Sequence, residues 1–456
     1  MPLKDGKAKK SEIRTGVIPS KQAIQRRFGS QRNFRHGICV MKNRPSPKQR
    51  TMKRSLSVVL STAALAPMML MSQPLNTGKP TVASVADGNN RFAEALYHQL
   101  RTEKEGNLFF SPFSISTAFA MAYAGAEGST SDEIKRVLHF GDNTGDFHAA
   151  YGDYMKQLLG SAEGNLELNI ANRLWGAMDF QASPEYLAKT GFAYGAPLVN
   201  LDYATKTEAS RIKINDWVAD QTKDRIKDLL QPGMITPETR MVLTNAIYFK
   251  ADWEKAFNEE YTREQSFYTV DGRTEQRKFM SRNEHLNYAE TKEAKWLRIP
   301  YKGGKHSMVI ALPHNRGEIA KLEENLKLSD LQKVYMNREK VDVLLPKFKM
   351  TQPITLSETL KAMDMKIAFS DGANFSGMST KEGLKISEVI HKAFVEVDEK
   401  GTEAAAATAI VMTLTSSAHY EPMERPKRFY ADHPFLFFIM DDTTQNVLFM
   451  GRIMEP

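Results

Sequence analysis

Hydrophobic residues recur along the chain with two different spacings. In the first half the spacing is three to four residues, as in the predicted amphipathic helices Asn90–Glu103 and Glu208–Thr222. In the second half, apolar and polar positions more often alternate, as they do in β-strands. Because helices come first and strands come later, the pattern favours one mixed α+β domain over alternating βαβ units.

The strand signals give the outline of two sheets. Met241–Phe249 is almost wholly apolar, which is typical of the centre of a sheet. Asp271-Gly272 lies between two alternating segments and predicts a tight hairpin turn. We also predict a strand at Val341–Phe348 and a strand-like segment at Ile386–Val397. A closing hairpin is predicted from two further strands, Phe435–Met440 and Asn446–Arg452.

An unusual segment, Glu399–Ala409, follows the strand that ends at Val397. Four consecutive alanines, Ala404 to Ala407, favour a helix by propensity, whereas Gly401 and the flanking polar residues favour a loop. A segment that changes from an exposed loop to a strand inside a sheet satisfies both, because small side chains enter between existing strands with little clash.

The charge of the chain is unevenly distributed. The 456 residues are 41% hydrophobic and have a formal net charge of +8. Residues 1–86 contain 17 Lys and Arg but 2 Asp and Glu, which leaves 45 against 52 for residues 87–456. The first part therefore has a charge of +15 and the rest −7. An acidic folded part argues against binding of nucleic acid.

The N-terminal part has the pattern of a secretory signal. Met52-Lys53-Arg54 forms a positive start, and Leu56–Met71 forms an apolar region too short to span a bilayer comfortably. We expect residues 52–86 to be a signal peptide with a short linker, cleaved near Ser72 or Ala86. Residues 1–51 are then an upstream extension that is not translated, or a basic disordered arm.

Enzyme chemistry finds no support in the sequence. The one cysteine, Cys39, lies in this extension, so disulfides and thiol chemistry are not expected in the folded part. The histidines show no metal-ligand spacing, and no metal or cofactor is predicted. Ser210-x-x-Lys213 matches one hydrolase motif, but Lys189-Thr190-Gly191 precedes it in the wrong order. We predict that the protein is not an enzyme.

Five blocks of sequence carry a family resemblance, and they occur in order between Asn89 and Arg452. They are Asn107–Ile115 (NLFFSPFSI), Leu243–Trp253 (LTNAIYFKADW), Ile390–Ala393 (IHKA), Ala431–Phe437 (ADHPFLF) and Leu448–Arg452 (LFMGR). Together with the segment after Glu399, they resemble the serpins, a family of protease inhibitors that act by refolding. Loop insertion in serpins is itself a known example of strand addition.

The resemblance implies a serpin fold at residues 87–456, with three β-sheets, about eight or nine helices and an exposed reactive-centre loop at about 399–430. It also implies three groups of site residues. A polar cluster behind the main sheet, the shutter, would contain Ser111, Ser114, Asn245 and His391. The top of the sheet, the breach, would contain Trp253, Lys347 and Glu399, with an ion pair between Lys347 and Glu399. The hinge would contain Glu399, Gly401, Thr402, Ala404, Ala405, Ala406, Ala407 and Thr408.

The bond that a protease would cut follows from counting along the loop. Serpins place it after the seventeenth residue, counting the hinge glutamate as the first. Counting from Glu399 gives Thr415–Ser416, with Leu414–Thr415 as a close alternative. Counting back from Pro434 gives Met423–Glu424 instead. We favour the forward count, because the length of the inserting arm is constrained mechanically and extra residues after the bond only lengthen a tether.

The implied function is that of a suicide substrate, which traps a serine endopeptidase as a covalent acyl-enzyme. Thr415 and Leu414 suit elastase-like or subtilisin-like enzymes rather than trypsin-like ones. An inhibitor of papain-like cysteine proteases and a non-inhibitory serpin remain alternatives. We expect a monomer with no nucleic-acid partner and no membrane span, from a secreted prokaryotic member of the family, located in the extracellular space or periplasm.

Overall fold

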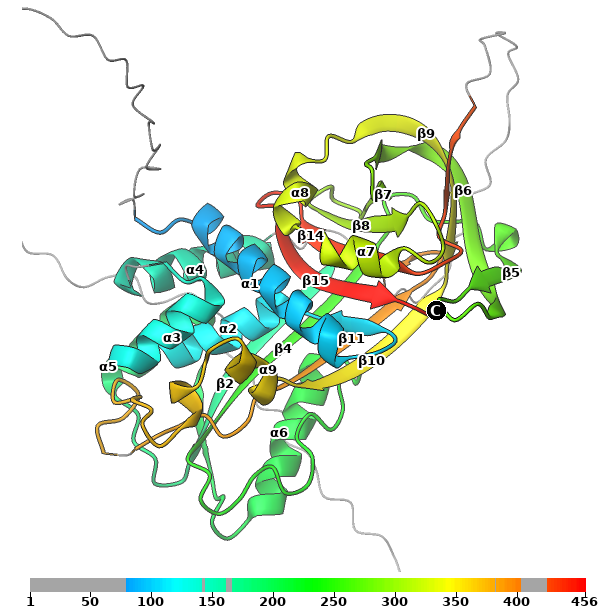
Figure 1. Cartoon of the computed structure of the whole chain (residues 1–456). Coiled ribbons are helices and arrows are strands. Elements are labelled where there is room, and N and C mark those ends of the chain that lie inside the picture. Colours follow the sequence, from blue (N-terminus) through cyan, green and yellow to red (C-terminus); the bar gives the residue numbers. More distant parts are fainter. Residues whose placement is uncertain (1–78, 142–143, 161–165, 382, 403–424) are drawn as a thin grey trace, which may run out of the picture. The chain divides into compact units, whose positions relative to one another are not determined.

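The computed structural model describes residues 79–456, except 142–143, 161–165, 382 and 403–424. This part of the chain contains nine α-helices and fifteen β-strands (Figure 1). The helices are α1 (Val82–Glu103), α2 (Pro112–Tyr123), α3 (Gly128–Leu138), α4 (Thr144–Gly160), α5 (Pro184–Tyr194), α6 (Thr207–Gln221), α7 (Ile319–Glu324), α8 (Leu328–Lys333) and α9 (Ser357–Ala362).

Nine strands form one sheet. In spatial order they are β1 (Leu108–Phe110), β15 (Asn446–Ile453), β14 (Phe435–Asp441), β8 (His306–Pro313), β7 (Ala294–Pro300), β6 (Thr274–Glu290), β9 (Asn337–Pro346) and β13 (Lys427–Tyr430), with β5 (Arg263–Tyr268) also paired to β6. Every residue of β8, β14 and β15 is buried, which explains why their sequences are nearly continuous apolar runs.

The other six strands are β10 (Phe348–Thr355), β11 (Ile390–Val397), β12 (Gly401–Thr402), β4 (Met241–Asp252), β2 (Glu167–Ala177) and β3 (Leu198–Leu201), in that spatial order. They consist of two ladders, β10–β11 and β4–β2–β3, which are joined through the two residues of β12. With the nine-stranded sheet this makes three groups of strands. The α+β class, the three groups and the number of helices in the described part agree with the prediction.

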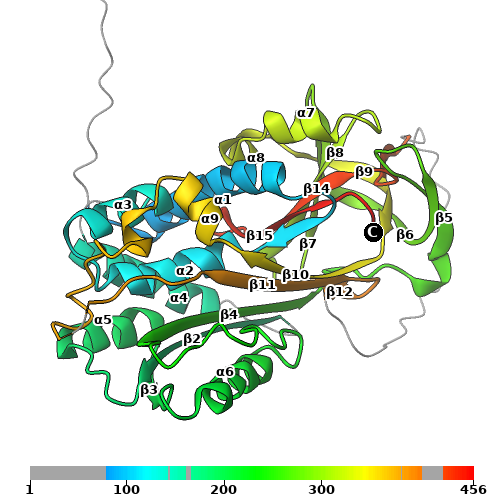
Figure 2. The same ribbon diagram turned by 60° about the horizontal axis from the view of Figure 1, so that its bottom comes forward.

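Helix α2 lies between the two sheets. It packs against β4 of one sheet and β15 of the other, and it is almost wholly buried. Ser111 caps its N-terminus by accepting a hydrogen bond from the backbone N–H of Ser114, and Pro112 occupies its first turn. Helix α6 packs on β4 from the opposite side (Figure 2). The six-stranded sheet is therefore supported from within by α2, directly behind β4.

Three predicted boundaries were wrong. The strand expected at Ile386–Val397 begins at Ile390, as β11. Helix α1 begins at Val82 rather than Asn90, with a capping box formed by Thr81 and Ser84, so that the predicted cleavage position Ala86 lies inside the helix and is buried. The predicted strand Val341–Phe348 is two strands, because β9 ends at Pro346 and β10 begins at Phe348. The predicted signal start at Met52 and the position Ser72 lie outside the described residues. In the part that the structure describes, no helix combines the length and the apolar character that crossing a membrane requires.

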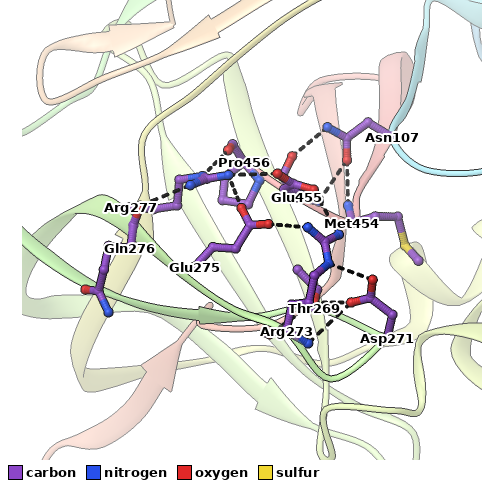
Figure 3. A network of polar contacts seen from close by, with 10 residues as sticks. All are labelled: Asn107, Thr269, Asp271, Arg273, Glu275, Gln276, Arg277, Met454, Glu455 and Pro456. Carbon is purple, nitrogen blue, oxygen red and sulfur yellow. Dashed lines mark hydrogen bonds and ion pairs between the residues drawn. The ribbon is translucent and has the colours of Figure 1, made fainter.

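A polar network anchors the C-terminal tail to the hairpin of β5 and β6 (Figure 3). Arg277 donates to the backbone oxygen of Pro456 at 2.7 Å and to the Glu455 carboxylate at 2.8 Å. Arg273 contacts Glu455 at 3.5 Å, and the Asn107 side chain both donates to and accepts from the tail backbone. Strand β15, which leads into this tail, is thus held by side-chain contacts in addition to its backbone pairing with β1 and β14.

Candidate functional site

The candidate site begins with an incomplete pairing between β4 and β11. On its outer side β4 pairs with β2 from Met241 to Lys250, and β11 pairs with β10 along its whole length. On the side where β4 and β11 face each other, the described residues contain three paired positions: Gly401 with Asp252, and Thr402 with both Ala251 and Val397. We call the remaining space between the facing edges, 241–250 of β4 and 390–396 of β11, the slot.

The direction of the strands defines what the slot can accept. Since β12 is antiparallel to both β4 and β11, these two strands run parallel to each other. A strand placed between them would pair antiparallel on both edges, as β12 already does at one end. Among the described residues the slot therefore has the geometry of a sheet with one strand missing, and β12 lies at one end of it in the matching direction.

Gly401 is required by the close approach of two backbones. A Cβ atom at this position would lie 2.0 Å from the carbonyl oxygen of Ala251 and 2.7 Å from the Cα of Asp252. No other residue fits without moving β4. The turn before it is fixed by Asp398, whose carboxylate accepts the backbone N–H groups of Lys400 at 2.9 Å and Gly401 at 3.2 Å. Burial raises the pKa of Asp398, and these two hydrogen bonds oppose that rise.

Two buried aromatic residues, Trp253 and Tyr301, contact the hinge from the interior of the protein. Trp253 donates through its indole Nε1 to the carbonyl oxygen of Asp398 at 3.0 Å and through its backbone N–H to Lys400 at 2.8 Å. Its ring stacks on Tyr301, with centroids 4.6 Å apart and planes 7° apart. The Tyr301 hydroxyl hydrogen-bonds the hydroxyl of Thr402 at 2.6 Å. The Thr402 side chain therefore points into the interior, where it is 2% exposed.

The structure brings Lys347 and Glu399 together. The ammonium of Lys347 is 2.6 Å from the Glu399 carboxylate, which also accepts the Thr262 hydroxyl at 2.7 Å. Burial alone would raise the pKa of Glu399, but the bonds from Lys347 and Thr262 outweigh it and hold this pKa below its ordinary value. This pair joins the corner between β9 and β10 to the hinge.

The four polar residues predicted for the shutter form one hydrogen-bonded chain behind the slot. The backbone N–H of Ser111 donates to Nε2 of His391 at 3.0 Å, and its hydroxyl accepts the backbone N–H of Ser114 at 3.1 Å. The hydroxyl of Ser114 then donates to Asn245. His391 and Asn245 lie on the two strands that border the slot, so α2 connects them from within. Burial lowers the pKa of His391 to about 3, which keeps the acceptor nitrogen unprotonated.

Five contributors to the site were not predicted from the sequence. Asp398 and Thr262 are described above, and the others are Asn172, Leu448 and Tyr301. Asn172 of β2 accepts the side-chain amide of Asn245 at 2.6 Å, and the carbonyl oxygen of Leu448 accepts the Ser111 hydroxyl at 2.6 Å. Tyr301 comes directly after β7, and nothing in its sequence neighbourhood indicates that it contacts Thr402. The only signal for Asn172 in the sequence was a polar residue among the apolar residues of a strand, since such a residue needs a hydrogen-bond partner.

The remaining predicted site residues lie outside the described residues. These are the hinge positions Ala404 to Thr408, the favoured bond Thr415–Ser416 with Leu414, and the alternative Met423–Glu424. The description resumes at Arg425 and continues into β13, which pairs parallel to β9. Among the described residues, no group of three or more His, Cys, Asp or Glu is arranged to hold a metal ion.

Comparison with known proteins assigns the family. The model of the serpin family, described as serine protease inhibitors, matches residues 87–456. The chain belongs to the serpin family. It is 38% identical to a serpin-like protein of Methanosarcina mazei over 85% of this chain and 91% of that one, and 39% identical to a leukocyte elastase inhibitor of Xenopus tropicalis over 77% and 93%.

Solved structures with the same fold include both states of one protein. Uncleaved ovalbumin matches with a TM-score of 0.72 and 30% identity, covering 82% of this chain and all of that chain. A loop-inserted, cleaved ovalbumin mutant matches with a TM-score of 0.73 and 29% identity, covering 83% and 100%. These structures confirm the serpin fold predicted from the sequence. The family model and the elastase inhibitor among the relatives make protease inhibition the general function class of this chain.

Proposed function

We propose that this protein is an inhibitory serpin that traps a serine endopeptidase as a covalent acyl-enzyme. The observation that carries the proposal is the slot, which already holds the first two residues of an antiparallel strand. After cleavage the arm that follows Thr402 fills the rest of the slot. The attached protease moves with it.

The register of β12 says where each residue of the arm would lie. Thr402 pairs with Ala251 and Val397, so Thr408, six residues on, falls between Asn245 and His391. Side chains alternate along a strand, and Thr402 points inward. The inward positions of the arm are then Thr402, Ala404, Ala406, Thr408, Ile410, Met412 and Leu414.

This alternation matches the interior that the arm would meet. None of the inward residues is charged, whereas Glu403 would face solvent. Thr408, the one polar inward residue after Thr402, falls at the polar chain of Asn245 and His391. Its hydroxyl can satisfy groups that would otherwise be buried against apolar atoms. The sequence of the arm therefore fits the register deduced from β12 at the inward positions, where a buried charge or an unpaired polar group would destabilise the inserted form.

The chemical step is an acyl transfer. The serine hydroxyl of the protease attacks the carbonyl carbon of Thr415, the amide bond to Ser416 breaks, and the new amino terminus takes the proton. The thirteen residues from Glu403 to Thr415 span about 43 Å as a strand. Met412 would reach Met241, the first residue of β4, so Thr415 and the attached protease lie beyond the end of the slot.

The driving force is the pairing that the slot lacks. A new strand gains ladder hydrogen bonds on both edges at ~1 kcal/mol each, so about 10 kcal/mol is available over a dozen residues. The loop-out form is then held by a kinetic barrier. Neither Thr415 nor Leu414 is basic, which favours elastase-like or subtilisin-like targets over trypsin-like ones.

Incubation with elastase, subtilisin, trypsin and papain tests the proposal. A band on a denaturing gel at the summed masses, formed with elastase or subtilisin and abolished when the protease serine is blocked beforehand, is expected. Mass spectrometry of the released C-terminal fragment identifies the bond. A fragment that starts at Ser416 supports the forward count, one that starts at Glu424 replaces it, and cleavage without any stable complex overturns the inhibitory assignment.

We also propose that the protein is exported through the signal that begins at Met52. A cut after Ala86 would remove the capped first turn of α1, which makes the region of Ser72 the better cleavage position. N-terminal sequencing of protein recovered outside the cell should give a start between Ser72 and Thr81. A start upstream of Met52 would contradict the proposal.

A further inference from the structure

A cationic surface lies where the reactive loop rejoins the fold. It contains Lys292, Lys295, Arg316, Arg425, Lys427 and Arg428, and we call it the basic foot. Arg425 is the first described residue after the loop, and Lys427 and Arg428 begin β13. A surface pocket of about 490 Å³ lies in its middle, with Lys295, Arg316 and Arg428 among its lining residues.

The basic foot is positively charged, whereas the folded part of the chain has a negative net charge. Residues 87–456 have a net charge of −7, yet six cations gather here against four carboxylates: Glu290, Glu293, Asp342 and Asp432. Three of these carboxylates already accept hydrogen bonds, from Tyr288, Tyr430 and Arg316 respectively. The surface therefore keeps an excess of positive charge.

Two of the six cations are fixed in place, and they shape the pocket. Arg316 lies over the ring of Tyr268, 3.1 Å from its centroid, and donates to Asp432 at 3.3 Å. Lys295 donates to the backbone oxygen of Arg428 at 3.2 Å. Lys292, Lys427 and Arg428, by contrast, are exposed, and within the described residues their side chains make no hydrogen bond or salt bridge. These three are available to an external anion.

We infer that the basic foot is a second contact site for the target protease and selects proteases that present carboxylates beside their active-site cleft. The inference rests on the proposed function. Arg425 is nine residue steps from Ser416, so the two lie within about 30 Å of each other even in a fully extended chain. A compact protease of ~200 residues has a radius of gyration of about 16 Å. A protease seated on the bond therefore reaches the basic foot, and complementary charge there accelerates association.

The test compares K292Q/K427Q/R428Q with K206Q/K213Q/K327Q. The second variant loses the same charge at exposed lysines on and before α6 and before α8. Association rate constants are measured between 50 and 500 mM NaCl with each protease that the wild type traps, together with the number of inhibitor molecules consumed per protease. Dextran sulfate serves as a non-protein polyanion in a separate binding measurement.

For at least one trapped protease we expect the first variant to associate about three- to tenfold more slowly at low salt, with the difference disappearing at high salt. The control variant should match the wild type, and the inhibitor consumed per protease should not change. Equal rates for all three proteins with every trapped protease would overturn the inference and leave the proposed function intact. Loss of dextran sulfate binding without any change in rate would also overturn it, in favour of a sulfated polymer as occupant. Absence of any complex with wild-type protein would overturn the proposed function as well.

Discussion

The centre of the nine-stranded sheet and the centre of the six-stranded sheet treat their strand edges in opposite ways. β14 is paired on both edges, with β8 and β15, and all of its residues are buried. Among the described residues, β4 and β11 each pair along one edge, and on the edges that face each other both pair with β12 alone. The backbone groups at the centre of the nine-stranded sheet are thus paired on both sides. Among the described residues, β4 and β11 leave most of their facing edges without a partner strand.

The polar contacts of the two regions also differ: some support strands that are already paired, and others connect strands that are not paired with each other. At the C-terminus, Arg273 and Arg277 hold Glu455 from a neighbouring hairpin and complete a finished structure (Figure 3). Behind the slot, Ser111 and Ser114 connect Asn245 and His391 across strands that are not paired with each other. The second arrangement holds two edges at a distance. Under the proposed function, the intact protein is packed around the slot without being at its lowest free energy.

Cleavage of Thr415–Ser416 should produce the largest change. We expect the cleaved arm to fill the slot, so that β4 and β11 become paired on both edges, as β14 already is. New pairing worth about 10 kcal/mol should raise the melting temperature by about 20 °C or more. Circular dichroism of intact and clipped protein measures this. The Thr402→Arg variant clipped at the same bond is the matched control and should show a much smaller rise. An unchanged melting temperature in clipped wild type would mean that the slot does not accept the arm.

Thr402→Arg should turn the inhibitor into a plain substrate. The Thr402 side chain is buried against Tyr301, so an arginine there places an unpaired charge under the sheet as insertion begins. We expect at least a tenfold rise in inhibitor consumed per trapped protease, while the bond is still cut. Glu403→Arg changes a residue that would face solvent and should trap normally. Normal trapping by Thr402→Arg would contradict the register deduced from β12.

The sequence was sufficient for the elements whose apolar residues form a continuous run or recur with a helical period. Met241–Phe249 was recognised as a central strand, and Glu208–Thr222 differs from α6 by one residue at each end. A turn at Asp271-Gly272 was expected for a chemical reason, and Gly272 does adopt a positive φ of 86°. The predicted two-residue type I′ form was wrong, because Asp271 has no positive φ and five residues separate the last pair, Tyr268 and Thr274. Local patterns of this kind need no knowledge of the rest of the chain.

Features that depend on distant contacts could not be derived from local patterns. The break at Lys347 was missed because apolar residues continue through it, although β9 and β10 belong to different sheets. The pairing of Lys347 with Glu399 and the cluster around His391 were anticipated through family resemblance. The contacts of Tyr301 and Asn172 came from neither source, since they depend on which strands become neighbours.

Lys347→Ala should weaken the breach by about 2–3 kcal/mol. It leaves the buried Glu399 carboxylate without its cation, and the partial exposure of Lys347 keeps the loss below that of a fully buried pair. Lys349→Ala is the matched control, since Lys349 and its partner Glu396 are more exposed and should contribute less than ~0.5 kcal/mol. Urea unfolding curves compare the two. Equal losses would show that the hinge is no more tightly held than the open surface of the sheet.

Acidification should produce the smallest of these effects, and His391 makes its direction predictable. Burial lowers the pKa of His391 from 6.5 to about 3, so the folded form binds fewer protons than the unfolded form between these values. Stability should therefore be complete above about pH 6.5 and decrease as the pH falls toward 3.

At pH 5 the loss due to His391 alone should be about 2 kcal/mol. His148 and His306 are also buried with lowered pKa values, so the wild type loses more in total. The contribution of His391 is isolated by comparing the change in urea midpoint between pH 7 and pH 5 for wild type and His391→Gln, in which the amide oxygen can still accept from Ser111. His314→Gln, at an exposed position, should behave as wild type. If His391→Gln loses as much stability as the wild type over this range, His391 is protonated in the folded protein and its bond from Ser111 does not hold the border of the slot as described.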